Sequence, residues 1–327
     1  MYPNPILQER IREAVETLGI PDTPSTLYDP IRYILDMGGK RIRPMMALLA
    51  ANLFGELDEA CERAMPAAMA VELFHNSTLM HDDILDDAPL RRGKPSVHEK
   101  WDINTAILSG DVTLVFAYLQ LAKSDPARLP ALLDVFNRVV LEVCEGQQLD
   151  MDYEKQPRVT IDEYVDMIRM KTSVLLGGAA ELGALAMGAS ASDIRDIGNF
   201  GIYVGIAFQL QDDILDVFGN PDTFGKQLGG DILANKKTYL LIKALELAKN
   251  EDKDELEGLL SGTDLAPEDK VNRVKALYER LNVLREAQGA MDAFSARAFE
   301  ALDRVSVSEE RKAALRALAR QLLVRQH

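Results

Sequence analysis

Two short acidic segments contain the residues of this sequence best suited to chemistry. The first reads DDILD from Asp82 to Asp86, and the second reads DDILD from Asp212 to Asp216. Carboxylates one helical turn apart repel each other, and they are costly to remove from water unless a cation lies between them. Both segments therefore predict sites for metal ions.

Each acidic segment continues the apolar face of an expected helix. In the first helix, steps of three or four residues lead through Val71, His75, Thr78, Asp82 and Asp86. In the second helix, four-residue steps lead through Val204, Phe208, Asp212 and Asp216. Residues at this spacing share one helix face, so these carboxylates lie on the side that faces the core, and a third acid, Asp83 or Asp213, is adjacent. Two solvated acidic faces would also fit an acidic protein, but the shared pattern disfavours that interpretation.

The spacing of the acids favours Mg²⁺ over Ca²⁺. Neither segment has the alternating oxygen ligands and the central glycine of an EF-hand loop. Mg²⁺ prefers octahedral oxygen coordination and keeps several positions for water and phosphate oxygens. Two facing pairs of carboxylates would hold a few Mg²⁺ ions around one diphosphate.

Local cations accompany the acidic segments, although the formal net charge of −15 repels phosphates at long range. The segments GGKRIRP, PLRRGKP and FGKQLGGDILANKKTY supply Lys40, Arg41, Arg43, Arg91, Arg92, Lys94, Lys226, Lys236 and Lys237. Lys171 and Thr172 follow the helical pattern YVDMIRMK. Gln147 and Asp150 continue the apolar stripe of residues 129–143, and Gln209 could present its amide close to the second acidic segment. GGKRIRP is not a P-loop, which requires GxxxxGK[ST]. Guanidinium groups bind phosphates bidentately, so these segments predict a phosphate site.

The elements that position these residues are expected to be helices. Apolar residues recur at steps of three and four almost everywhere, as in the stripe from Leu129 to Val143, and period-two runs are hard to find. Gly- and Pro-containing breaks are short, and no repeat of fixed period is present. We therefore expect an all-α fold, with residues 1–327 forming a single domain of ten or more helices.

Composition excludes several classes of protein. An excess of acidic residues argues against nucleic acid as a partner, because phosphate backbones are bound through clustered Lys and Arg. Cys61 and Cys144 lack metal-ligand spacing and are read as reduced packing residues. No run approaches the roughly 18 apolar residues of a membrane span, and residues 1–20 lack the apolar region of a targeting peptide. A cytoplasmic location is the expectation.

The order and spacing of these motifs resemble the trans-isoprenyl diphosphate synthases, the polyprenyl synthetase family. GGKRIRP, ELFHNSTLMHDDILDDAPLRRGKP, GQQLD, KT, FQLQDDILD, FGKQLGGDI and KKT occur in the family's order between about residues 28 and 240. The resemblance implies helices around a deep central cavity, a homodimer, and head-to-tail condensation of isopentenyl diphosphate with an allylic diphosphate (dimethylallyl, geranyl or farnesyl).

The resemblance also implies a role for each matching residue. The implied ligands of two or three Mg²⁺ ions are Asp82, Asp86, Asp212 and Asp216. The implied catalytic set adds Asp83, Asp213, Lys171 and Lys226. The diphosphate of isopentenyl diphosphate is assigned to Lys40, Arg43, His75 and Arg92. The allylic diphosphate is assigned to Arg91, Lys171, Thr172, Gln209, Lys226 and Lys236.

Product length is set in this family by side chains just before the first acidic motif, which line the floor of the cavity. Here Ser77 and Thr78 are small, where farnesyl-producing relatives commonly carry an aromatic residue, and Phe74 lies one turn deeper. We therefore expect geranylgeranyl diphosphate or a longer product, and a farnesyl diphosphate synthase is the competing interpretation.

Two rival functions stay open. A class I terpene synthase would cyclise an allylic diphosphate without isopentenyl diphosphate, but such enzymes usually replace the second aspartate motif and lack GGKRIRP. A non-catalytic partner subunit of a heteromeric synthase typically loses an aspartate motif, and this chain keeps both.

Overall fold

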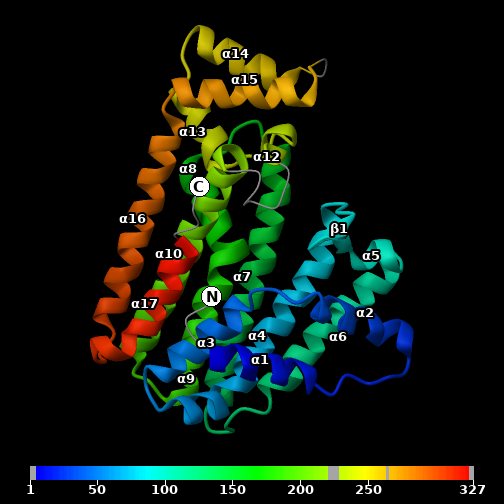
Figure 1. The fold of residues 1–327 in the computed structure, drawn as a ribbon, viewed down its shortest axis with the longest axis vertical. Coiled ribbons are helices and arrows are strands. Elements are labelled where there is room, and N and C mark those ends of the chain that lie inside the picture. Colours follow the sequence, from blue (N-terminus) through cyan, green and yellow to red (C-terminus); the bar gives the residue numbers. More distant parts are fainter. Residues whose placement is uncertain (1–4, 220–227, 263–264, 324–327) are drawn as a thin grey trace. The chain divides into compact units, whose positions relative to one another are not determined.

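The computed structural model describes residues 5–219, 228–262 and 265–323, and it is almost entirely helical (Figure 1). The expected all-α class, with ten or more helices, is therefore confirmed. The helices are α1(Pro5–Glu16), α2(Ser25–Asp36), α3(Ile42–Asn52), α4(Leu57–Leu85), α5(Val97–Lys100), α6(Ile103–Leu121), α7(Leu129–Lys155), α8(Ile161–Ile168), α9(Val174–Met187), α10(Ala191–Phe218), α12(Gly230–Leu233), α13(Tyr239–Leu247), α14(Glu251–Ser261), α15(Pro267–Arg280), α16(Val283–Arg304) and α17(Glu309–Leu323). A π-helical turn, η1(Arg169–Ser173), separates α8 from α9.

The chain divides into two compact units. Unit 1 comprises Met1–Val140, Leu175–Gly198 and Arg304–Ala317. Unit 2 comprises Leu141–Val174, Asn199–Asp303 and Leu318–His327. The first acidic motif belongs to unit 1 and the second to unit 2. A single domain and a central cavity stay predictions.

In unit 1, α4 packs closely along α6. Ser77 Oγ on α4 donates a 2.7 Å hydrogen bond to the carbonyl oxygen of Gly110 on α6. A Cβ atom at Gly110 would lie 2.2 Å from Nε2 of His81, so a side chain at this position would displace the His81 imidazole. These contacts hold α4 in place just before the first acidic motif.

A small hairpin follows α4 and carries the PLRRGKP segment. Its strands, β1(Leu90–Arg91) and β2(Lys94–Pro95), pair antiparallel, with Arg91 opposite Lys94. The two connecting residues, Arg92 and Gly93, have φ values of 54° and 75°. Positive φ at both central positions defines a type I′ turn, which matches the twist of a two-stranded hairpin. The turn fixes the backbone positions of the two arginines of PLRRGKP.

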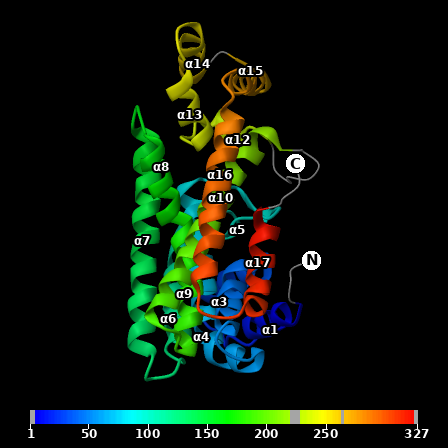
Figure 2. The same cartoon turned by 90° about the vertical axis from the view of Figure 1, so that its left-hand side faces the viewer.

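Unit 2 has its own apolar core, in which α15 packs on α12, α13 and α14 (Figure 2). A capping box starts α8: Thr160 Oγ1 accepts the N–H of Glu163 at 3.3 Å, and a Glu163 carboxylate oxygen accepts the N–H of Thr160 at 2.8 Å. These bonds satisfy two backbone donors that the helix itself cannot pair. They fix the start of the segment that leads to Lys171.

None of the helices among residues 5–219, 228–262 and 265–323 combines the length and the apolar character needed to cross a bilayer.

Candidate active site

The first acidic motif lies at the carboxyl end of α4. Along this face Val71 is 1% exposed, His75 and Asp82 are half-buried, and Asp86 is exposed and caps the helix. The stripe therefore stays on one helix face, as the sequence predicts, and it passes from the core to the surface, which the sequence pattern does not predict. Carboxylates near a helix carboxyl end meet the negative end of the macrodipole, which adds about 0.3–1 kcal/mol of repulsion each. A cation at this end of α4 would relieve that repulsion.

The middle acid of the first motif has a partner within the protein. Asp83 is 1% exposed and accepts two hydrogen bonds from Arg91, Nε to Oδ2 at 2.7 Å and Nη2 to Oδ1 at 2.6 Å. Such a fork is the strongest geometry available to an arginine–carboxylate pair. Asp83 thus fixes the hairpin residue Arg91, while Asp82 and Asp86 lie on another face of the helix.

Arg92 reaches back from the hairpin to the GGKRIRP loop. A Cβ atom at Gly39 would lie 2.7 Å from the Arg92 guanidinium, so a side chain at position 39 would displace this guanidinium. Gly39 has φ +131°, a conformation that side-chain-bearing residues rarely adopt. Two basic motifs that are distant in sequence are therefore in contact.

Arg43 and His75 meet in the same unit. Arg43 Nη1 lies 3.0 Å from Nε2 of His75. Burial lowers the pKa of His75 well below its usual value, and the charges of Arg43, Arg92, Arg91 and Arg41 lower it further. The imidazole is therefore neutral at pH 7, and its Nε2 can accept from Arg43.

The arginines themselves show the effect of like charges held together. Burial lowers the pKa of Arg43 to about 10, against the favourable charge of Glu72, and Arg92 adds to the decrease. Burial also lowers the pKa of Arg92, with a further contribution from Arg41. Arg43 Nε is buried without a hydrogen-bond partner among the described residues. A cluster of cations with an unused donor is an arrangement that an anion would complete.

The second acidic motif lies in the last turns of α10. Val204 is fully buried, while Phe208, Asp212 and Asp216 are half-buried, so this stripe also runs from the core towards the surface. Asp216 Oδ2 accepts the N–H of Asp231 at 3.1 Å, at the start of α12. This bond orients the Asp216 carboxylate.

Asp213, the middle acid of the second motif, is also held by the protein. Its Oδ2 accepts the hydroxyl of buried Tyr164 at 2.5 Å and the N–H of Tyr239 at 3.1 Å. Burial raises the pKa of Asp213 to about 7, and Asp231 adds to the rise, while the two hydrogen bonds and Lys236 oppose it. The middle acids of both motifs therefore have a side-chain partner within the protein, half-buried Arg91 for Asp83 and buried Tyr164 for Asp213.

Lys171 lies in the π-helical turn η1 and forms an ion pair with Asp150 of α7. A Cβ atom at Gly146 would lie 2.2 Å from the backbone nitrogen of Lys171, so glycine lets α7 approach this turn. Single π-helical turns are frequent at functional sites. Thr172 is half-buried in the same turn. The sequence named Asp150 only as the end of a stripe, and its pairing with Lys171 was missed.

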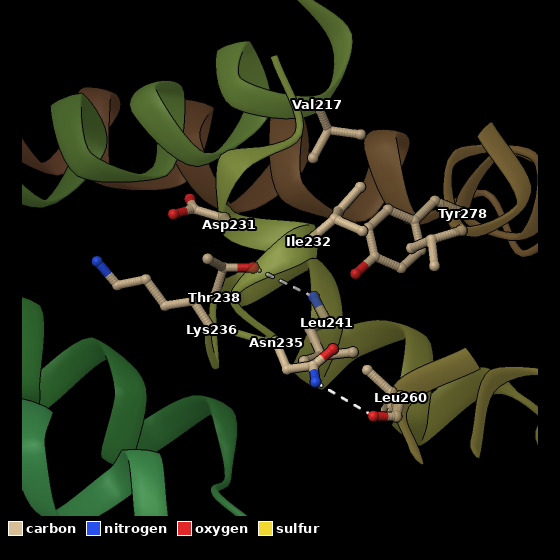
Figure 3. Close-up of a pocket in the computed structure, with 10 residues that line it drawn as sticks. Val217, Asp231, Ile232, Asn235, Lys236, Thr238, Leu241, Leu260 and Tyr278 are labelled. Carbon is tan, nitrogen blue, oxygen red and sulfur yellow. Dashed lines mark hydrogen bonds between the residues drawn. The ribbon is translucent and has the colours of Figure 1, made fainter. Parts of the chain in front are cut away.

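Lys236 follows α12 and is exposed. Figure 3 shows Lys236 and Asp231 extending to the same side of α12, away from Tyr278. Gln209 is half-buried on α10. Lys226, predicted to bind the allylic diphosphate, lies outside the described residues.

The expected floor residues lie on α4, one to two turns before the first motif. Phe74 is 2% exposed and packs edge-on against Phe136, with ring centroids 5.9 Å apart. Ser77 is 3% exposed, and half-buried Thr78 donates from Oγ1 to the carbonyl oxygen of His75 at 2.8 Å. Phe74 is thus part of an aromatic cluster.

The donor set fits Mg²⁺. No three His, Cys, Asp or Glu side chains form a ready-made metal cluster within the described part of the chain. Each motif instead offers two carboxylates one turn apart, with its middle acid engaged elsewhere. Mg²⁺ commonly takes one or two carboxylates and completes its shell with water and substrate phosphates.

Helices with paired acidic motifs at their carboxyl ends, and a cation cluster beside one of them, define an all-α protein built to bind phosphorylated ligands. The polyprenyl synthetase family model matches residues 24–281. The geranylgeranyl diphosphate synthase of Methanosarcina mazei is 43% identical over 225 residues, which are 68% of either chain. The chain belongs to the polyprenyl synthetase family, as its motifs predict.

Solved structures agree with this membership. A crystal structure of a geranylgeranyl pyrophosphate synthase is 42% identical and superposes with a TM-score of 0.92, covering 98% of both chains. The geranylgeranyl pyrophosphate synthase of Corynebacterium glutamicum, crystallised with isoprenyl diphosphate and magnesium, is 29% identical, with a TM-score of 0.84 and 98% coverage of both chains.

Proposed function

We propose that the protein is a Mg²⁺-dependent prenyltransferase that joins isopentenyl diphosphate head to tail (1′-4) to an allylic diphosphate and releases pyrophosphate. The observation that carries the proposal is the cation cluster of Arg43 and Arg92 beside neutral His75. His75 lies on α4, the helix that also carries Asp82 and is capped by Asp86 at its carboxyl end. An anion site built from protein cations would then lie within the same unit as a metal-binding motif, a few turns away. The proposed reaction uses two diphosphates, of which only one leaves. It therefore requires two different sites, one built from protein cations and one built around metal ions.

The non-departing diphosphate, that of isopentenyl diphosphate, is assigned to Lys40, Arg43, His75 and Arg92. Arginines bind phosphate oxygens without weakening the C–O bond as strongly as a metal ion does. His75 is neutral and therefore adds no charge, and it orients Arg43 instead. The isopentenyl double bond is thereby held as the nucleophile.

The departing allylic diphosphate is assigned to the metal motifs and to the second set of basic and polar residues. Two or three Mg²⁺ ions, held by Asp82, Asp86, Asp212 and Asp216, would neutralise the negative charge that develops on the leaving group. The other contacts are assigned to Arg91, Lys171, Thr172, Gln209, Lys226 and Lys236. Asp83 acts by holding Arg91 in place. Asp213 acts by holding Tyr164 and the start of α13 in place.

The resulting allylic cation is attacked by the isopentenyl double bond, and loss of a proton completes the new unit. Apolar surroundings protect such a cation from water. The small Ser77 and Thr78 leave the first position of the floor without an aromatic residue, and Phe74 follows one turn deeper. Geranylgeranyl diphosphate is the proposed product, and a longer chain is the proposed product if the Phe74 side chain does not close the floor.

A homodimer is the proposed assembly. Within the described part of unit 1, α6 exposes the apolar side chains of Ile107, Leu108, Val115 and Leu119, each 43–55% exposed. Such a row on one helix is typical of a surface covered by a second copy. We place the enzyme in the cytoplasm, which suits the fact that neither buried Cys61 nor exposed Cys144 is part of a disulfide.

The test is turnover by the purified protein with Mg²⁺, labelled isopentenyl diphosphate and each of the three allylic primers, followed by product sizing. We expect a linear product of geranylgeranyl length or longer. A cyclic hydrocarbon formed from the allylic substrate alone would indicate a terpene synthase. No turnover until a second chain is added would indicate a partner subunit.

A further inference from the structure

A buried carboxylate that no motif assigns lies beside the cation cluster of unit 1. Glu72 on α4 is only 3% exposed, and it forms an ion pair with Arg41. Its Oε1 also accepts a 2.9 Å hydrogen bond from Nδ2 of Asn76. A buried charge of this kind is costly unless it is paired, so its partner indicates its use.

Arg41 connects three helices through its side chain and backbone. Nη1 contacts Glu72 on α4, and Nη2 donates a 2.6 Å hydrogen bond to the carbonyl oxygen of Leu35 near the end of α2. Its backbone caps the start of α3, where φ is +47°. A non-glycine residue in this region costs about 1–2 kcal/mol, and it persists only where the surroundings hold it.

The pairing follows a simple register. Glu72 and His75 are three residues apart and share one face of α4. Arg41 and Arg43 start α3, and each arginine meets one of these two side chains. The same face of α4 therefore positions both arginines, one through a charge and one through a neutral ring.

The arginines of this cluster differ in whether a carboxylate forms an ion pair with them. Glu72 forms an ion pair with Arg41, whereas no carboxylate among the described residues forms an ion pair with Arg43 or Arg92. The charge of Glu72 still favours the charged forms of Arg43 and Arg92, but without direct contact, and burial lowers the pKa of both arginines. Arg41 is thus committed to the protein, and Arg43 and Arg92 keep their charge for an anion. Lys40 precedes Arg41 in the chain, so the conformation of Arg41 also sets the direction of Lys40.

We infer that Glu72 is a positioning residue for the isopentenyl diphosphate site, and that it acts through Arg41 without touching the substrate. The inference rests on the proposed function. Glu72 fixes the left-handed conformation at Arg41, and this conformation orients Lys40 and Arg43 towards the diphosphate.

The test is a kinetic comparison of Glu72→Gln with the wild-type enzyme. Glutamine keeps the size and the acceptor oxygen but removes the charge that holds Arg41. We expect the KM for isopentenyl diphosphate to rise about tenfold, while the KM for the allylic substrate and kcat stay within about threefold. A general loss of folding would lower kcat or the active fraction instead.

Two further variants make the comparison decisive. Glu59→Gln removes an exposed acid of the same helix and should change neither KM. The double variant Glu72→Gln with Arg41→Met replaces the buried ion pair by neutral side chains, which cores often tolerate. If Glu72 acts through Arg41, the double variant should show about the same KM increase for isopentenyl diphosphate as Glu72→Gln alone, because both variants break one and the same interaction. It also serves as the test if Glu72→Gln alone does not fold.

An unchanged KM for isopentenyl diphosphate in a folded Glu72→Gln or double variant, with an active wild-type enzyme, would overturn the inference. Equal increases in both KM values would overturn it too, because a selective effect on one substrate is required. A wild-type enzyme that does not turn over isopentenyl diphosphate would instead refute the proposed function. The two failures are therefore distinguishable.

Discussion

The Arg92 guanidinium lies directly against Gly39, so close that a Cβ atom at position 39 would be 2.7 Å from its central carbon. The neighbouring Gly38 also has a positive φ, of 71°, but a Cβ atom there would meet nothing within 4 Å. Substitutions at the two adjacent glycines therefore separate two effects, backbone strain alone and backbone strain with displacement of Arg92, which we propose binds isopentenyl diphosphate.

Gly39→Ala should selectively weaken the binding of isopentenyl diphosphate. The methyl group would push the flexible end of Arg92 aside, and we expect the KM for isopentenyl diphosphate to rise about tenfold or more. Gly38→Ala, the matched control, should cost about 1–2 kcal/mol of stability and leave this KM within about threefold. Steady-state kinetics and denaturant unfolding measure the two quantities. Equal KM changes in both variants would show that the contact with Arg92 has no role.

Arg92→Asn should trade substrate affinity for stability. Arg92 is the first central residue of a type I′ turn with φ +54°, and asparagine adopts this region more readily than arginine. We expect the free energy of unfolding to stay the same or to rise by about 0.5–1 kcal/mol, while the KM for isopentenyl diphosphate rises about tenfold. Lys94→Gln, which changes an exposed cation of the same hairpin, should alter neither. A destabilised Arg92→Asn variant with normal KM would contradict both parts.

Asp82→Asn and Asp83→Asn should fail in different ways. Asp83→Asn breaks the buried fork to Arg91, and we expect a loss of about 2–4 kcal/mol in the free energy of unfolding. Asp82→Asn should change stability by less than about 1 kcal/mol, but lower kcat about a hundredfold and raise the Mg²⁺ concentration required for activity. Thermal unfolding and Mg²⁺ titrations of activity separate the two. Reversed results would mean that Asp83 holds the metal.

Ser77→Phe should shorten the product. A phenyl ring at this buried position would close the floor above Phe74, although the added volume and the lost hydrogen bond to Gly110 should cost about 1–3 kcal/mol. Ser77→Ala, the control, removes only the hydroxyl and should leave product lengths unchanged. Chromatographic sizing of the prenyl products is the measurement. The same distribution in both variants would place the closure elsewhere.

The helical fold and the shared helix face of each acidic stripe could be predicted, because both depend on local periodicity. The i, i+4 spacing that relates Asp82 to Asp86 survives folding unchanged. The partner of the middle acid could not be predicted in the same way, since Tyr164 lies 49 residues from Asp213 and meets it only in the folded unit. Tertiary contacts of this kind leave no periodic signal.

The basic motifs show the same limit. Glu72 stands in an apolar run three residues before His75, which is a signal that a cation must be near, but the sequence alone does not say which arginine. The π-helical turn at Lys171 lies directly against Gly146 on α7, a tertiary contact between segments distant in sequence. The sequence pattern places Lys171 on a helix but cannot reveal that this turn is the wider, π-helical kind.

The most direct test of the proposed reaction compares the pyrophosphate released with the isopentenyl units incorporated into product by the purified enzyme. We predict equal molar amounts throughout the time course, and no release when either isopentenyl diphosphate or Mg²⁺ is omitted. Release of pyrophosphate from the allylic diphosphate alone, at the rate measured with both substrates, would contradict the account.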